Sequence, residues 1–138
     1  MAVVEELIRK EENGTLSFGN FELTSKSKLS DFEYEGDLYK IKTFKEITKL
    51  EKNGMFVYES VPGTTVTGMK CREDGMEFSV EGKEDAQITI ELEPETEYDV
   101  CIAGRDSVVM KTNLGGKINM SVELNAGELV VVSATKKA

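Results

Sequence analysis

The chain of 138 residues contains no histidine. Histidine is the commonest acid–base residue and metal ligand near neutral pH. Its absence excludes serine–histidine and cysteine–histidine nucleophile pairs, and it also excludes most zinc sites. We therefore expect a protein that is not an enzyme, with no catalytic residues, no metal and no cofactor.

Cysteine is scarce as well. Cys71 and Cys101 are the only two in the sequence, and two reduced thiols are typical of a cytosolic protein. No apolar run approaches the roughly 20 residues that a membrane-spanning helix needs. The first residues include glutamates where a signal peptide would be basic. Together these features predict a cytoplasmic protein.

Positive charge is in deficit, because 17 Lys and Arg stand against 26 Asp and Glu, which gives a net charge of −9. A surface of this sign repels the phosphates of nucleic acid and the anionic face of a membrane. We therefore expect neither a nucleic acid nor a membrane as a partner. Electrostatic binding to a basic protein is an alternative that the charge leaves open.

The strongest positive signal is alternation of apolar and polar residues with a period of two, interrupted by turns that contain glycine. In the second half it predicts strands over residues 77–80, 87–92, 98–102, 107–111, 117–124 and 129–132. Several short strands at this spacing are typical of an antiparallel sandwich or barrel. We predict an all-β protein with an antiparallel immunoglobulin-like β-sandwich.

The first half repeats this pattern less clearly. Asn13-Gly14 and Asn53-Gly54 each lie between two short alternating segments, and Asn-Gly favours tight hairpin turns. Residues 3–12 fit either a short amphipathic helix or part of a hairpin, whereas residues 44–50 favour a strand. No linker divides the chain, so we predict a single sandwich domain over residues 1–138. The alternative is an N-terminal hairpin region, 1–65, followed by a C-terminal sandwich, 66–138.

Residues 91–100 read ELEPETEYDV, with an acidic residue at every second position. The segment resembles the entry to the sixth strand of fibronectin type III and related immunoglobulin-like sandwiches. There a tyrosine hydroxyl bonds back to upstream backbone and forms a tyrosine corner. The resemblance implies structural roles for Tyr98 and Pro94, with the glutamates in solvent. Cys101 lies three residues after Tyr98, and successive side chains of a strand point to opposite faces of the sheet. Cys101 is therefore expected on the face opposite Tyr98, and an interior disulfide is not expected.

Three residues are candidates for ligand binding, and each has a structural alternative. Tyr39 and Tyr58 could lie at a surface and bind a sugar, although a place in the core is the favoured role for both. Glu59 follows a hydrophobic run and is either a half-buried functional carboxylate or a residue that bonds turn amides. Residues 31–37 partly match a calcium loop, but Lys42 occupies the place of its bidentate glutamate. A strand is therefore the expected structure there.

Residues 54–64, 84–89 and 110–117 together resemble a group of short bacterial proteins labelled endosialidase, and the resemblance spans essentially the whole chain. That label implies cleavage of polysialic acid. No catalytic position of the endosialidases matches a residue of this sequence, so the resemblance assigns no site residues.

The first functional hypothesis is a non-enzymatic protein that acts by protein binding or self-association. Sandwich sheets have free edges, which pair with other chains unless they are protected. Residues 3–4 and 129–132 are the predicted edges, and a homo-oligomer is therefore expected. The alternative is a carbohydrate-active module, either a sugar-binding protein or a sialidase-like glycosidase.

Overall fold

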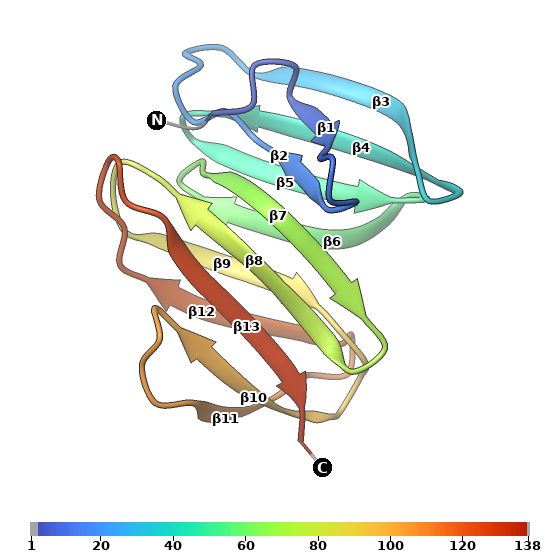
Figure 1. The fold of residues 1–138 in the computed structure, drawn as a ribbon, viewed down its shortest axis with the longest axis vertical. Coiled ribbons are helices and arrows are strands. Elements are labelled where there is room, and N and C mark those ends of the chain that lie inside the picture. Colours follow the sequence, from blue (N-terminus) through green and yellow to red (C-terminus); the bar gives the residue numbers. More distant parts are fainter. Residues whose placement is uncertain (1–2, 138) are drawn as a thin grey trace.

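The computed structural model describes residues 3–137, which form two packed antiparallel sheets (Figure 1). The order of the seven-stranded sheet is β1 (Ile8–Lys10), β2 (Leu16–Phe18), β7 (Thr65–Arg72), β8 (Gly75–Glu81), β13 (Val130–Lys136), β10 (Glu97–Ile102) and β11 (Val108–Lys111). The order of the six-stranded sheet is β12 (Lys117–Val122), β9 (Ala86–Glu91), β6 (Met55–Val61), β5 (Ile47–Lys52), β4 (Asp37–Phe44) and β3 (Ser27–Tyr34). The predicted all-β antiparallel sandwich is confirmed. Within residues 3–137 no helix is long and apolar enough to cross a membrane.

The inner face of the six-stranded sheet carries an apolar row that crosses five strands. In register, Ile41 pairs with Leu50, Leu50 with Tyr58, Tyr58 with Ile90, and Ile90 with Ile118. All five side chains are buried. Because successive residues of a strand point to opposite faces, the neighbours of this row in sequence lie on the outer face.

The two sheets meet at Tyr58, which has no exposed surface. Its ring packs edge-on against Phe18 and Phe78, with ring centroids 5.3 and 5.6 Å away. Both partners belong to the seven-stranded sheet. The Tyr58 hydroxyl is hydrogen-bonded to Thr64 Oγ1 at 2.7 Å, so the polar end of this core residue is also satisfied.

The N-terminal region is a hairpin and contains no helix within residues 3–137. Strands β1 and β2 pair antiparallel on either side of Asn13-Gly14. Asn53-Gly54 joins β5 to β6 as a two-residue loop, and both residues have positive φ angles, 50° and 79°. These angles are those of the type I′ turn that matches the twist of a hairpin. Residues 44–50 end β4 and form most of β5, as the sequence predicts.

Tyr98 lies buried near the start of β10. Its hydroxyl accepts a hydrogen bond from the backbone N–H of Glu93, at 3.2 Å. This is the geometry of a tyrosine corner. Pro94 is exposed in the connection from β9 to β10, and Glu95 and Glu97 are exposed beside it.

The strand order changes which segments lie at the edges. Strand β13 pairs with β8 on one side and with β10 on the other, so the prediction that residues 129–132 form an edge is wrong. Residues 3–4 belong to no strand; Val4 is buried, and its N–H donates to the carbonyl of Gly19 at 3.1 Å. The edge strands are β1, β11, β12 and β3. Strands from both halves of the chain share each sheet, because β2 pairs with β7 and β6 with β9.

Candidate functional site

A groove of about 790 Å³ lies at one end of the sandwich, surrounded by the turns of the hairpins β1–β2, β3–β4, β5–β6 and β7–β8. This volume is within the range of small-ligand sites. Its apolar lining includes Tyr39, Phe56, Met69 and Met76, which come from both sheets. The groove therefore has the size and the apolar walls that a ligand site requires.

Several polar groups in and beside the groove are engaged with one another. Lys52 forms an ion pair with Asp37 at 3.5 Å, and Arg72 forms one with Asp74 at 3.1 Å. The Tyr34 hydroxyl donates to the carbonyl of Gly14 at 2.6 Å. Over the described part of the chain, no buried side-chain nitrogen or oxygen lacks a hydrogen-bond partner. The buried polar groups of the groove are thus satisfied within the protein, and the exposed residues Glu35, Lys70 and Glu73 also line it.

Two tyrosines form the aromatic wall of the groove. Tyr39 is 8% exposed and packs edge-on against Tyr34, with ring centroids 5.6 Å apart. Burial raises the pKa of Tyr34 to about 12 and also raises the pKa of Tyr39. Both phenols are therefore neutral at physiological pH, and they can offer aromatic contacts and neutral hydrogen bonds but no negative charge.

The structure does not bring the three predicted ligand-binding residues together. Tyr39 lines the groove, whereas Tyr58 lies in the core with no exposed surface. Glu59 is half-buried on the outer face of the six-stranded sheet, in register with Lys49 and Thr89. The groove residues Phe56 and Met69 were missed because turns distant in sequence converge only after the sheets are assembled.

Residues 31–37 form the end of β3, a turn and the first residue of β4. Phe32 and Tyr34 are half-buried, while Asp31 and Glu33 are exposed. Among residues 3–137, no three His, Cys, Asp or Glu side chains are grouped so that they could hold a metal ion. Asp31 and Glu33 are thus exposed on β3, whereas Glu35 and Asp37 lie at the turn and line the groove.

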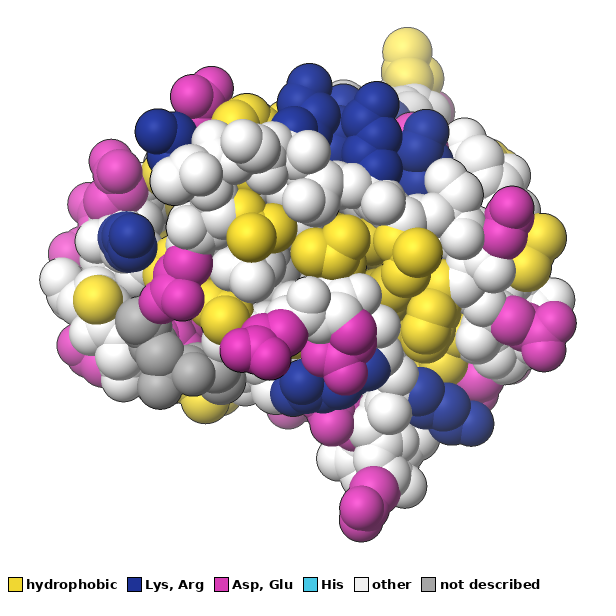
Figure 2. Space-filling model, turned by 90° about the horizontal axis from the view of Figure 1, so that it is seen from above, with side chains coloured by type: hydrophobic (Ala, Val, Ile, Leu, Met, Phe, Trp, Pro, Cys, Tyr) yellow, Lys and Arg dark blue, Asp and Glu magenta, His cyan; other side chains and the backbone are white. Residues whose placement is uncertain are grey.

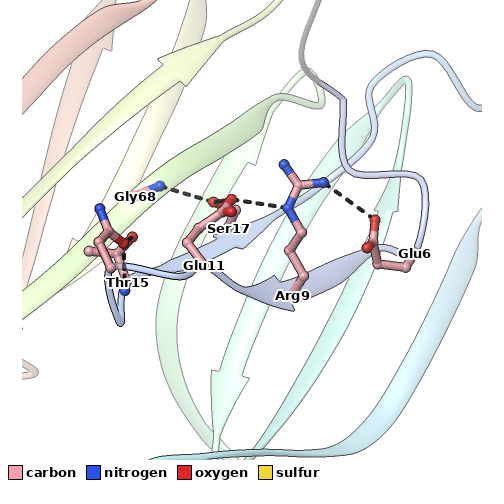
Figure 3. Close-up of polar contacts among 7 residues, drawn as sticks. Glu6, Arg9, Glu11, Thr15, Ser17 and Gly68 are labelled. Carbon is pink, nitrogen blue, oxygen red and sulfur yellow. Dashed lines mark hydrogen bonds and ion pairs between the residues drawn. The ribbon is translucent and has the colours of Figure 1, made fainter.

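A serine–carboxylate pair in the N-terminal hairpin has the composition of a nucleophile and a base (Figure 3). The Ser17 hydroxyl donates to Glu11 Oε2 at 2.5 Å and accepts the N–H of Gly68 at 3.1 Å, and Arg9 Nε donates to the same Glu11 oxygen at 3.0 Å. Ser17 has no exposed surface, so no substrate can reach it. The hydrogen bond from Ser17 lowers the pKa of Glu11, which makes this carboxylate a poorer base. The cluster instead connects the β1–β2 hairpin to β7.

The four edge strands differ in how they are protected. Strand β3 carries Lys28, Asp31 and Glu33 and has an irregular register with β4, and β1 has only three residues, two of them basic. Charged residues and irregular pairing are common ways to block the addition of another strand. Strand β12 shows polar side chains on its exposed face: Lys117, Asn119 and Ser121.

Strand β11 lacks such protection over three consecutive residues, Val108, Val109 and Met110. Val108 is 57% exposed and Val109 is 44% exposed. Its single charge, Lys111, lies at the end of the strand. The sequence predicts this strand but not its edge position, because the order of a sheet depends on pairing between distant segments.

Cys71 provides a test of the groove geometry. The residue is exposed and lines the groove, and partial burial of its thiol raises the thiol pKa. Since the thiolate is the reactive form, a raised pKa lowers the reactive fraction at neutral pH. We expect Cys71 to react several-fold more slowly with iodoacetamide than a cysteine-containing unstructured peptide at about pH 7, and the difference to shrink as the pH rises.

The measurement is the rate of mass increase in a Cys101→Ser variant, which leaves Cys71 as the single thiol. Urea-unfolded protein is the control, because unfolding removes the groove. Equal rates for the folded and unfolded chains would show that the thiol of Cys71 is freely solvated.

Comparisons of the chain with protein-family models, curated proteins and solved structures gave no match. The fold alone therefore defines its class, an antiparallel β-sandwich with one end groove and one apolar edge strand.

Proposed function

We propose that this protein has no catalytic activity and acts by protein binding, with self-association through β11 as its main mode. The observation that carries the proposal is the unpaired edge of the seven-stranded sheet, where Val108 and Val109 are exposed. Unpaired backbone groups on such an edge can accept another strand, and apolar side chains add to the affinity. In the groove, by contrast, every buried polar side-chain atom is already hydrogen-bonded.

Antiparallel pairing of β11 with β11 of a second copy would give a two-fold dimer, which is the commonest form of homo-oligomer. The pairing extends the sheet and places the exposed valines of the two copies near one another. Each copy would thereby remove the same unprotected edge from solvent.

We expect the wild-type protein to have the mass of a dimer by light scattering, and Val109→Lys to raise the dissociation constant by about tenfold or more. A lysine introduces a charge at an edge that depends on apolar contacts. The matched control is Val61→Lys, because Val61 is 52% exposed but belongs to β6, which has strands on both sides. A wild-type monomer at high protein concentration, or equal effects of both variants, would contradict the proposal.

A carbohydrate-active module is the second candidate, and the groove is the observation that favours it. Tyr34 and Tyr39 form an aromatic wall, and aromatic faces are common in sugar sites. Screening against a glycan array and against sialylated polymers tests this function. Binding or cleavage that is lost in Tyr39→Ala would support it, whereas no hit and no cleavage would remove it.

A further inference from the structure

Three lysines face one another across adjacent strands on the outer side of the six-stranded sheet. Lys28 of β3 pairs with Lys42 of β4, and Lys42 pairs with Lys49 of β5. Neighbouring strands are about 4.8 Å apart, and like charges directly opposite each other destabilise a sheet. The inner face of β4 and β5 carries the apolar pair Ile41 and Leu50. The alternation of side chains along these strands therefore explains why polar residues lie on the outer face, but it does not explain why all three are lysine.

Two further lysines extend this row. Lys40 lies two residues from Lys42 in β4, so alternation places it on the same face. Lys26 precedes β3, and its Nζ lies 6.0 Å from the ring centroid of Phe44, which is two residues beyond Lys42 in β4. We call Lys26, Lys28, Lys40, Lys42 and Lys49 the lysine face. Four of them, with Glu51, line a shallow hollow of about 50 Å³. In Figure 2, which views the molecule from the end that carries β3, a large group of basic side chains lies at the top of the view, above a band of hydrophobic side chains, and smaller basic groups lie at the left and bottom.

The positive charge of the lysine face is only partly compensated, because Glu51 lies opposite Lys40 and Glu59 lies opposite Lys49 in register. Within residues 3–137, Lys49 is the only one of the five in an ion pair, with Glu51 at 3.7 Å. Partial burial lowers the pKa of Lys42, and the charges of Lys26, Lys49, Lys28 and Lys40 lower it further. Lys42 is therefore close enough to the other four ammonium groups to be repelled by them.

The remainder of the molecule has the opposite charge. Without these five residues, 12 basic residues stand against 26 acidic ones, a balance of −14. Cations are thus concentrated on one uncovered sheet face of an acidic protein. Because exposed charges separated by more than about 8 Å are screened at physiological ionic strength, a bound segment would respond mainly to the local positive charge.

We propose that the lysine face binds an extended acidic segment of a partner protein, at a site separate from β11. In an extended chain alternate side chains are about 6.7 Å apart. The pair Lys40–Lys42 has the same spacing along β4, so glutamates at alternate positions of a bound segment would each meet an ammonium group. Lysine binds carboxylates as a point charge and does not need the fixed fork geometry of arginine.

Other anionic partners fit this face less well. Single-stranded nucleic acid binds with its bases stacked on open aromatic rings. Here Lys26 Nζ lies 6.0 Å from the ring centroid of Phe44, and Lys49 Nζ lies 6.0 Å from that of Phe56, so ammonium groups already cover these rings. An anionic membrane extends far beyond the patch, and the acidic remainder of the molecule would repel it.

The test is fluorescence anisotropy with a labelled peptide of alternating glutamate and serine at low ionic strength. We expect the wild-type protein to bind the peptide, and Lys28→Gln/Lys42→Gln/Lys49→Gln to bind at least about tenfold more weakly. The control Lys10→Gln/Lys83→Gln/Lys137→Gln removes the same charge from exposed lysines outside the face and should bind within about twofold of wild type. Added salt should weaken binding of the wild type.

Folding of the Lys28→Gln/Lys42→Gln/Lys49→Gln variant can be checked independently by thermal unfolding. Because the variant loses like charges at facing positions, its thermal midpoint should be unchanged or higher than that of the wild type. Binding that is absent in the wild type, or equally weakened in both triple variants, would overturn the proposal. Tighter binding of inorganic polyphosphate, a DNA oligonucleotide or anionic vesicles than of the peptide would also overturn it. The dimer measured with Val109→Lys is a separate readout, so failure of one proposal does not imply failure of the other.

Discussion

Tyr58→Ala is expected to lower the free energy of unfolding by about 3–5 kcal/mol, the usual range for removing a large aromatic side chain from a core. The substitution removes the ring that packs against Phe18 and Phe78 and so separates the two sheets at their centre. It also removes the hydroxyl group bonded to Thr64, which is itself buried. Urea unfolding, followed by circular dichroism, measures the change.

Tyr58→Phe is the control that separates the ring from the hydroxyl group. It retains the edge-on contacts and removes one buried hydrogen bond, so a loss of about 1–2 kcal/mol is expected. If Tyr58→Ala were no more destabilising than Tyr58→Phe, the aromatic contacts between the sheets would contribute nothing to stability.

Gly75→Ala is expected to be comparably severe, at about 3 kcal/mol or more, because a β-carbon at this position has no space. It would lie 1.8 Å from the carbonyl oxygen of Ala134 and 2.9 Å from its carbonyl carbon. Both are backbone atoms of β13, which pairs with β8 through Gly75 and Thr135. Relief of the clash therefore requires the central strands of the seven-stranded sheet to move apart.

Gly127→Ala is the matched control, since nothing lies within 4 Å of its added β-carbon, although its φ of +84° is unfavourable for alanine. A loss of about 1 kcal/mol is expected there. Thermal unfolding compares the two variants, and amide hydrogen exchange of β13 locates the damage. Similar losses for both variants would mean that the close approach of β8 and β13 does not constrain the sheet.

The local parts of the fold could be predicted from the sequence. Asn53-Gly54 specifies its turn because both residues tolerate positive φ angles. The alternation around Tyr98 predicts which side chains of β10 are buried. Both features depend only on residues that are a few positions apart in the chain, so the local sequence is sufficient to predict them.

Other elements were not predicted, for physical reasons that differ. Strand β7 was missed because Gly68 and an irregular register between Thr67 and Lys70 interrupt its alternation. Residues 133–136 of β13 were missed because serine, alanine, threonine and lysine give little apolar signal. Strand order, and with it the edge position of β11, depends on contacts between residues far apart in the chain.

The candidate sites were the least predictable. Lys28, Lys42 and Lys49 are unremarkable as separate residues of an acidic chain, and only the register of three strands aligns them. The groove requires four turns to meet at one end of the sandwich. Of the three residues chosen from the sequence, only Tyr39 lies in it, because aromatic composition predicts burial better than it predicts location.

The central place of β13 has a consequence for synthesis. This strand is translated after β8 and β10, yet it fills the gap between them. Until Lys136 has left the ribosome, the nascent chain therefore holds two unpaired strand edges that face the same gap, and intermediates of this kind are prone to aggregate. The gap is open from the emergence of β10 until that of β13, which is the interval in which a chaperone or rapid completion of the chain would protect the nascent protein.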